Sequence, residues 1–193
     1  MKFLRDFGIT ILIAIAIFAL LRVTIQGYKV QYSSMLPGIE EGEWIMVNKA
    51  SYFFSDPERG EVIVFKPHEE VHSRHPFIKR IIGLPGDTVE IKDGRVFING
   101  IALEEEYIKE TPHYTTPPKK IPDDEYFVLG DNRNHSNDSH NGWTAPRENI
   151  VGKAWFVYWP PDNWRVIKHY SYPELAGASE QEAMLLNPIG GMT

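Results

Sequence analysis

The apolar run near the N-terminus constrains this chain more than any other feature. Residues 7–21, FGITILIAIAIFALL, contain no charged side chain, and residues 23–25 extend the run beyond Arg22. The run amounts to about 19 residues, close to the roughly 20 that a helix needs to cross a bilayer. Arg22 falls near one end, where its long side chain reaches the lipid headgroups. The sequence therefore predicts a transmembrane helix over residues 7–26.

The residues after this run distinguish a permanent anchor from a removable signal peptide. A signal peptide has a shorter apolar core followed by small residues in an A-x-A-like pattern. Residues 22–28, RVTIQGY, contain no such pattern. We therefore predict a retained anchor and a single-pass protein of the cell membrane.

Basic residues on the two sides of the anchor set its expected orientation. Lys2 and Arg5 favour a cytoplasmic N-terminus, while Arg22 and Lys29 on the other side make the asymmetry weak. We predict that residues 1–6 lie in the cytoplasm and that the long C-terminal part lies on the extracytoplasmic face.

Composition excludes several classes of site and partner. The 193 residues contain no cysteine, which removes disulfides, thiol nucleophiles and thiolate metal sites. The formal net charge is -6, and the sequence lacks the clustered Lys and Arg that contacts to nucleic-acid phosphates require. We expect no nucleic-acid partner.

Beyond the anchor, the residue pattern predicts a mainly β protein. Short apolar runs and alternating segments are separated by Gly, Pro and Asp, which is typical of antiparallel strands. Strands are predicted over residues 43–48, 60–66, 77–83, 126–129 and 153–159. We expect an antiparallel β-sheet domain over residues 27–170, followed by a C-terminal tail over residues 171–193.

A β-hairpin is the clearest local signal in this domain. Residues 88–98, TVEIKDGRVFI, alternate on both sides of Asp93-Gly94, a dipeptide that strongly favours a two-residue hairpin turn. Residues 100–124 are polar and rich in proline, which predicts a surface excursion. Together, about residues 88–125 form an expected hairpin and cap-like insertion.

Two serines follow the anchor in the segment YSSMLPG, residues 32–38. A serine hydroxyl becomes a nucleophile near neutral pH only if a base removes its proton. One candidate base is a histidine oriented by a carboxylate, and His135 and His140 lie in a loop rich in Asp and Asn. The other is a lysine whose pKa is lowered by burial.

Lys79 is the lysine with suitable surroundings. It lies in PFIKRIIG, residues 76–83, where strand alternation places it on one face with Phe77 and Ile81. A shift of its pKa from about 10.4 to near 8 requires about 3 to 4 kcal/mol, which an apolar surrounding supplies. Arg80 is a weaker candidate because a guanidinium stays protonated. In the alternative interpretation, Lys79 is a solvated or edge-protecting strand residue.

Three motifs occur in order along the chain: Ser34-Met35 with Pro37, KRIIGLPGD over residues 79–87, and GDNRNHSNDS over residues 130–139. In order and spacing they resemble the motifs of bacterial type I signal peptidases, from the anchor to about Trp159. The resemblance implies a membrane-bound serine endopeptidase with a Ser/Lys dyad. It also implies that the enzyme removes N-terminal signal peptides from exported precursors and cuts after small residues in an Ala-x-Ala-like pattern.

The resemblance further implies roles for individual residues. Ser34 would be the nucleophile, and Lys79 would be the general base. Ser136 would hold the lysine amine, and Asp138 would support the site through the same loop. The backbone N–H of Ser34 would be the first oxyanion donor. The second donor stays open, because the family often has Ser or Gly where this chain has Tyr32, whose N–H or hydroxyl would then serve.

The chain departs from the family pattern at three places. Pro37-Gly38-Ile39 stands where the family favours Pro-Thr-Leu, and His140 stands where an arginine is common. Gly142-Trp143 is reversed relative to the usual order. These departures affect loop details more than the expected chemistry.

The expected partners follow from the anchor and the resemblance. They are the signal peptides of secreted precursors and the lipid bilayer, with the export translocon as a further candidate; no cofactor or metal is implied. About nine residues separate Ile25 from Ser34 and span at most about 30 Å, so the nucleophile stays near the bilayer. Aromatic side chains are candidates for the membrane interface, namely Phe53, Phe54, Trp159 and Trp164, whereas Trp155 is expected in the core.

Other function classes remain open from the sequence. Residues 68–72, HEEVH, fit the H-E-x-x-H zinc pattern with His75 nearby, but Pro67 and Pro76 leave room for only about two helical turns, which favours a solvated loop. A self-cleaving repressor-type peptidase would carry a DNA-binding segment in place of an anchor. An anchored, noncatalytic β-domain that binds partners is the third alternative.

Overall fold

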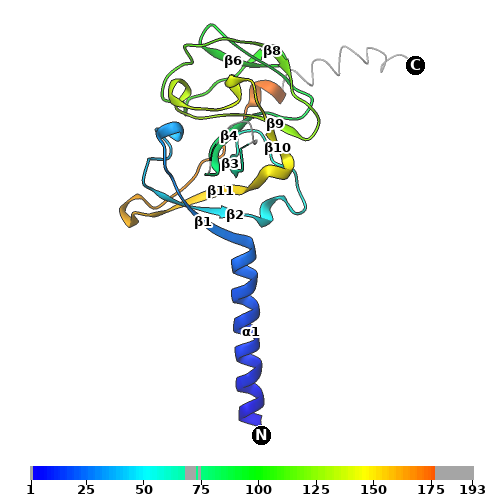
Figure 1. The fold of residues 1–193 in the computed structure, drawn as a ribbon, viewed down its shortest axis with the longest axis vertical. Helices are drawn as coiled ribbons and strands as arrows, with labels where there is room; N and C mark the ends of the chain where they lie inside the picture. Colours follow the sequence, from blue (N-terminus) through cyan, green and yellow to red (C-terminus); the bar gives the residue numbers. More distant parts are fainter. Residues whose placement is uncertain (1, 68–72, 74, 177–193) are drawn as a thin grey trace, which may run out of the picture.

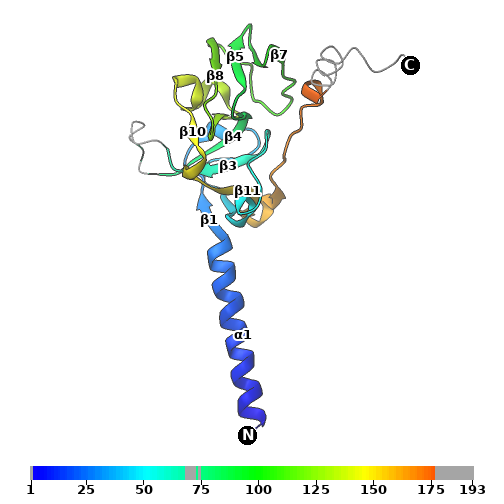
Figure 2. The ribbon, with the colours of Figure 1, turned by 90° about the vertical axis from the view of Figure 1, so that its right-hand side faces the viewer.

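The protein consists of one long N-terminal helix and a β-domain at its C-terminal end (Figures 1 and 2). This computed structural model describes residues 2–67, 73 and 75–176. Helix α1 (Lys2–Thr24) projects from the domain, and its residues 5–24 are long and apolar enough to cross a membrane, with a mean hydropathy of 2.4. A helix satisfies every backbone hydrogen bond within one segment, as a bilayer requires.

Strand β1 (Ile25–Lys29) follows α1 directly, so the helix ends two residues earlier than predicted. Ile25 and Gln26 pair with Asn48 and Val47 of the next strand. These ladder hydrogen bonds compete with continuation of the helix, and the apolar pattern of residues 7–26 contains no sign of them.

Within the described residues, the β-strands form an eight-stranded sheet and a four-stranded sheet, which confirms the mainly antiparallel β fold class. The larger sheet has the order β1-β2-β11-β3-β4-β9-β10, with β12 paired to β11. Its further strands are β2 (Trp44–Asn48), β3 (Val62–Phe65), β4 (Phe77–Gly83), β9 (Glu125–Leu129), β10 (Ala145–Pro146), β11 (Ile150–Trp159) and β12 (Arg165–Val166). The five strands predicted from the residue pattern correspond to β2, β3, β4, β9 and β11.

The smaller sheet lies at the end of the domain opposite α1 (Figure 1). It has the order β7-β6-β5-β8 and contains β5 (Thr88–Lys92), β6 (Arg95–Ile98), β7 (Ile101–Ala102) and β8 (Thr116–Lys120). Asp93 and Gly94 have φ angles of 50° and 71°, as a type I′ hairpin turn requires. The hairpin prediction is therefore confirmed. The polar segment after it is more ordered than predicted, because β7 and β8 extend the hairpin into a sheet.

Two of the buried clusters hold the two sheets and the serine-bearing segment together. One joins the smaller sheet to β4 and β9 and includes Ile82, Val89 and Phe127. Another lies against β2 and β11 and includes Met35 and Ile39, both 1% exposed. The segment that carries the two serines is therefore anchored in the core of the larger sheet.

Candidate active site

Ser34 lies on the short 3-10 turn η1 (Ser33–Met35), at the end of the extended segment that follows β1. Burial of Met35 on the same turn fixes its position, and Ile39 N–H donates to the carbonyl of Met35 at 2.9 Å. The side chain of Ser34 lines an open cleft of about 840 Å³. The turn therefore presents a hydroxyl to a space that a peptide can enter.

Lys79 reaches the same cleft from β4. Its Nζ lies 2.8 Å from Oγ of Ser34 and 3.1 Å from the carbonyl oxygen of Ile78. It also lies 5.2 Å from the centre of the Phe77 ring, on the face that strand alternation predicts. The residue is only 4% exposed. The structure thus brings together two residues that are 45 positions apart in the sequence.

Burial lowers the pKa of Lys79 to about 8, while the negative charges of Asp138 and Asp131 partly oppose this shift. Neither carboxylate forms an ion pair with the lysine within the described part of the chain. A substantial fraction of Lys79 is therefore neutral in mildly alkaline solution. A neutral amine in this position can accept the proton of Ser34 while it continues to donate to Ile78.

The loop after β9 is hydrogen bonded to the turn that carries Ser34. Asn132 N–H donates to the carbonyl of Ser34 at 3.0 Å, and its side-chain amide donates to the carbonyl of Ser33 at 3.0 Å. A Cβ at Gly130 would collide with Oγ of Ser136 and with the carbonyl oxygen of Ser34. The absence of a side chain at Gly130 therefore allows this loop to approach the nucleophile closely.

Ser136 and Asp138 lie in the same loop, as the resemblance implies. The hydroxyl of Ser136 is buried and has no hydrogen-bond partner among the described residues. Asp138 is fully buried, and its Oδ2 accepts the Gly130 N–H at 2.9 Å. An unpartnered buried hydroxyl is costly, which makes Ser136 a candidate for contact with a substrate or with the base.

Tyr32 precedes the serine turn in an extended conformation and is 63% exposed. Tyr32 lines the same cleft as Ser34. It is therefore available to a bound peptide, and its role in an oxyanion hole stays a prediction.

The histidine alternatives are placed differently. His140 Nδ1 lies 2.7 Å from Asp138, and His135 is exposed at the cleft. Neither is hydrogen bonded to Ser34 in the part of the chain that the structure describes, so the described residues do not assemble a Ser-His-Asp triad. The zinc pattern at residues 68–72 lies outside the described residues.

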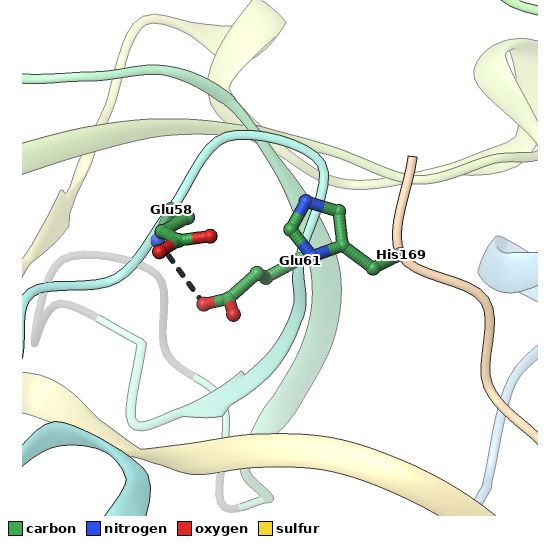
Figure 3. Close-up of side chains that lie close together, drawn as sticks. All are labelled: Glu58, Glu61 and His169. Atoms are coloured by element: carbon green, nitrogen blue, oxygen red, sulfur yellow. Dashed lines mark hydrogen bonds between the residues drawn. The ribbon is translucent and has the colours of Figure 1, made fainter. Parts of the chain in front are cut away.

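One cluster of potential metal ligands occurs among the described residues: Glu58, Glu61 and His169, with ligand atoms within 4.8 Å of one another (Figure 3). The Glu61 carboxylate already accepts hydrogen bonds from the Tyr52 hydroxyl at 2.6 Å and the Glu58 N–H at 3.0 Å. It is also paired with Lys153. The Glu61 carboxylate is therefore already neutralised by Lys153 and saturated with hydrogen bonds, so the cluster is better explained as a structural network than as a metal site.

Two segments contribute most of the cleft lining, and each of them carries one residue of the dyad. Residues 27–35 are one of these segments and residues 75–79 are the other, with His135 and Asn137 as further lining residues. Within the described part of the chain, β9 pairs only with the second half of β4, from Arg80 onward. The first half of β4 therefore has a free edge inside the cleft.

Sequence reasoning missed the residues that support the dyad from the loop after β9. Gly130 and Asn132 belong to the GDNRNHSNDS motif, but no contact with the serine turn was predicted for them. The available signal was that both residues belong to this motif. Their partners come from a segment about 100 residues earlier, which no local pattern specifies.

A buried lysine amine against a serine hydroxyl, in an open cleft of a β-domain with an apolar anchor, defines the class of a membrane-associated serine peptidase. The family model described as "Signal peptidase, peptidase S26" matches residues 4–159. The chain belongs to this family, which confirms the resemblance stated above.

Two relatives matched by sequence agree with this assignment. Signal peptidase I of Leptolyngbya laminosa is 42% identical over 165 residues, covering 83% of this chain and 80% of the relative. Signal peptidase I P of Bacillus subtilis subsp. natto is 38% identical over 170 residues, covering 82% and 90%. A solved signal peptidase I from Enterococcus faecalis V583 is 30% identical with a TM-score of 0.43, covering 51% of this chain and 97% of that chain.

Proposed function

We propose that this chain removes N-terminal signal peptides from exported precursor proteins, with Ser34 as the nucleophile and Lys79 as the general base. The observation that carries the proposal is the 2.8 Å distance between Lys79 Nζ and Ser34 Oγ in a buried site. Relatives named signal peptidase I, which align over most of the chain, support the substrate class.

The reaction follows from the geometry of the dyad. Neutral Lys79 accepts the Ser34 proton as Oγ attacks the scissile carbonyl, and it then donates that proton to the leaving amine. A water activated by the same amine hydrolyses the acyl-enzyme. The Ile78 carbonyl accepts from the lysine amine throughout, so the amine keeps its orientation in both protonation states.

The oxyanion needs two donors aimed at the tetrahedral intermediate. The Ser34 N–H is the first, and Tyr32 supplies the second through its hydroxyl or its N–H. Comparison of Tyr32→Phe with wild type separates the two sources. Loss of a hydroxyl donor lowers kcat by about 10²-fold or more, whereas a backbone donor leaves kcat close to wild type.

Ser136 and Asp138 complete the proposed site. The Ser136 hydroxyl, which is buried and unpartnered among the described residues, orients the Lys79 amine when the side chains adjust to a substrate. Asp138 fixes the loop that carries Ser136, through its hydrogen bond to Gly130. A Ser136→Ala variant is therefore expected to bind precursor normally and to cleave it more slowly.

The substrate lies in the cleft as an extended chain. The free edge of β4 at Phe77–Lys79 and the extended residues 27–32 offer main-chain donors and acceptors on both sides. A peptide that adds as a strand gains affinity from these main-chain bonds, and the side-chain pockets then select the small residues. The cut after an Ala-x-Ala-like pattern is the expected specificity.

The end of the domain beside α1 is the proposed membrane surface. β1, β2 and β11 lie next to the helix (Figure 1). Large exposed aromatic side chains on these strands and the adjoining loops are Trp44 (38%), Phe53 (58%), Phe54 (99%), Trp155 (38%), Trp159 (54%) and Trp164 (63%). Aromatic rings favour the headgroup region. Trp155, which was expected in the core, is 38% exposed because it lies where β11 shifts its register against β2, between Ala154 and Phe156.

The proposed surface and the anchor together support a position of the cleft near the bilayer, where a precursor presents its cleavage site. Quenching of tryptophan fluorescence by brominated lipid, in vesicles that contain the full chain, tests this arrangement. The basic residues before the apolar run favour a cytoplasmic N-terminus, which leaves the domain on the extracytoplasmic face beside the export translocon. Protease protection in intact cells tests the orientation, because an external protease digests an extracytoplasmic domain.

Cleavage of a synthetic precursor with an Ala-x-Ala site tests the proposed function. Detergent-solubilised wild type, Ser34→Ala and Lys79→Ala are compared with and without a chelator. Cleavage that survives chelation and disappears in both variants is expected. Chelator-sensitive cleavage that persists in Lys79→Ala would overturn the proposal and favour chemistry at residues 68–72. Equal processing by folded variants would favour a noncatalytic binding domain.

A further inference from the structure

His140 contacts the carboxylate of Asp138, the buried residue that supports the proposed site. Its Nδ1 lies 2.7 Å from Oδ1 of Asp138, and its N–H also donates to that oxygen at 3.3 Å. The imidazole stacks on the Tyr114 ring, with a centroid distance of 4.1 Å and an angle of 23°. The side chain is 19% exposed, whereas the Asp138 side chain is fully buried. The ring is therefore held from two sides and donates to a desolvated carboxylate.

Asp138 connects this contact to the dyad. Its other oxygen accepts the N–H of Gly130, the residue that packs against Ser34 and Ser136. Asp138 is also one of two carboxylates whose negative charge favours the protonated form of Lys79. A change in the compensation of this charge therefore changes how readily Lys79 becomes neutral.

The two carboxylates differ in what compensates their charge. Asp131 forms a two-pronged ion pair with Arg80, at 2.9 and 2.7 Å, so a permanent cation neutralises it. In the described part of the chain, the side chain that contacts the Asp138 carboxylate is the His140 imidazole, at 2.7 Å, which is a hydrogen-bond donor and not a permanent cation. The electrostatic effect of Asp138 on Lys79 therefore depends on the His140 imidazole, whereas the effect of Asp131 on Lys79 does not.

We propose that His140 is a positioning residue for the general base, which orients Asp138 and offsets its negative charge so that Lys79 is neutral more often. The inference rests on the proposed role of Lys79. His140 touches neither substrate nor the reacting atoms, and it acts through Asp138.

The other groups around His140 do not take over this task. Burial and the neighbouring Asp138 raise the pKa of Tyr114, so its phenol is neutral and adds no charge. Arg133 is committed to Glu105 by two hydrogen bonds of 2.6 Å. On the neighbouring strand β8, Lys119 donates to the carbonyl of Gly142.

The test compares His140→Phe with His140→Arg, each measured as kcat/KM against pH on the Ala-x-Ala precursor with the full-length protein. Phe keeps the stacking on Tyr114 and removes the donor, while Arg supplies a permanent cation. With Phe, Asp138 is less compensated and the Lys79 ammonium is favoured. The rising limb of the profile is the range over which kcat/KM increases with pH. In His140→Phe this limb is expected to shift to higher pH by about half a unit or more, which lowers kcat/KM at pH 7 by about threefold. With Arg, the limb is expected at or below its wild-type position.

His113→Phe is the matched control, because His113 is an exposed histidine whose contact to the loop uses only its backbone N–H. Its limb is expected to match wild type. An unmoved limb in folded His140→Phe, or a loss of activity equal at every pH, would overturn the proposal and leave His140 a packing residue. If His140→Phe does not fold, His140→Leu replaces it as a variant without a donor, and a limb equal to that of His140→Arg would overturn the proposal.

The Lys79→Ala variant separates this inference from the proposed function. Cleavage that persists in folded Lys79→Ala removes the dyad and this inference with it. Cleavage that requires Lys79 but shows no shift in the His140 variants removes this inference alone.

Discussion

Two buried basic residues occupy neighbouring positions on β4, and the pockets on the two faces of the strand shift their pKa values in opposite directions. Lys79 is 4% exposed and Arg80 is 3% exposed. On one face, Lys79 meets a hydroxyl, a carbonyl and an aromatic ring. On the other, Arg80 meets the carboxylate of Asp131 and the carbonyl oxygens of Gly60 and Lys168.

The difference shows that burial alone does not determine the behaviour of a charge. Burial lowers the pKa of Lys79 to about 8 because no carboxylate pairs with it in the described residues. Burial also acts against the charge of Arg80, but Asp131 outweighs it and the pKa of Arg80 is raised. The Arg80 guanidinium further lies 4.4 and 4.9 Å from the rings of Tyr107 and Tyr170. One face therefore produces a base and the other a permanent structural cation.

The substitution Lys79→Arg should break the comparison most severely, because it places a cation that cannot lose its proton on the Lys79 face. We expect cleavage to fall by about 10³-fold or more, with the fold retained. Precursor cleavage and circular dichroism measure the two effects. Lys79→Met, which has a similar length and no charge, should lose as much activity. Substantial activity in Lys79→Arg would show that this side chain is not the base.

Gly130 lies where the two pockets meet, since it precedes Asp131 and packs against Ser34 and Ser136. Gly130→Ala is expected to displace the serine turn and lower kcat by about 10²-fold, because small misplacements of reacting groups are costly. Gly38→Ala is the matched control, since a Cβ there meets its nearest atoms at 3.7 Å. Equal kcat values for the two variants would contradict the close approach.

The pH dependence of kcat/KM sharpens the comparison, because the pKa of Lys79 is lowered to about 8 whereas that of Arg80 is raised. The reaction needs the neutral amine, so kcat/KM should rise about tenfold per pH unit below the pKa of Lys79 and level off above about 8. The sign follows from deprotonation of the base on raising the pH. A profile that is flat between pH 6 and about 9, measured on wild type with a pH-stable precursor, would contradict an active lysine base.

Arg80→Lys is expected to give the smallest effect on activity and to act on stability. The change keeps the charge but loses the two-pronged contact to Asp131 and the packing against the Tyr107 and Tyr170 rings. We expect the free energy of unfolding to fall by about 2 kcal/mol, with the pH limb unmoved. Thermal unfolding and the pH profile together measure both. A shifted limb without destabilisation would show that Arg80 belongs to the chemistry.

Local sequence patterns were sufficient for several elements. The Asp93-Gly94 turn was predicted because its residues favour positive φ angles, and β4 was predicted with its observed bounds because apolar residues flank Lys79 and Arg80 on both sides. The anchor was predicted because its length and lack of charge leave few alternatives. These signals are contained within about 25 residues, so they do not depend on the rest of the fold.

Other features required the tertiary structure. β1 pairs with β2 although its first two residues, Ile25 and Gln26, were predicted to end the anchor helix, and β7 and β8 join a sheet although they lie in a polar segment. The contacts of Gly130 and Asn132 to the serine turn join segments about 100 residues apart. Such pairings depend on which edges and cavities the folded chain brings close, and no local periodicity reports that.

The sequence by itself determined the apolar anchor, the antiparallel strands and the identity of Ser34 and Lys79 as a candidate pair. Only the tertiary structure decided that Lys79 is buried against the serine hydroxyl while Arg80, one residue further, is neutralised by Asp131. The physical reason is that a pKa depends on desolvation and on the charges within a few ångströms. Both are properties of the folded packing around a side chain, and the residue type alone does not contain them.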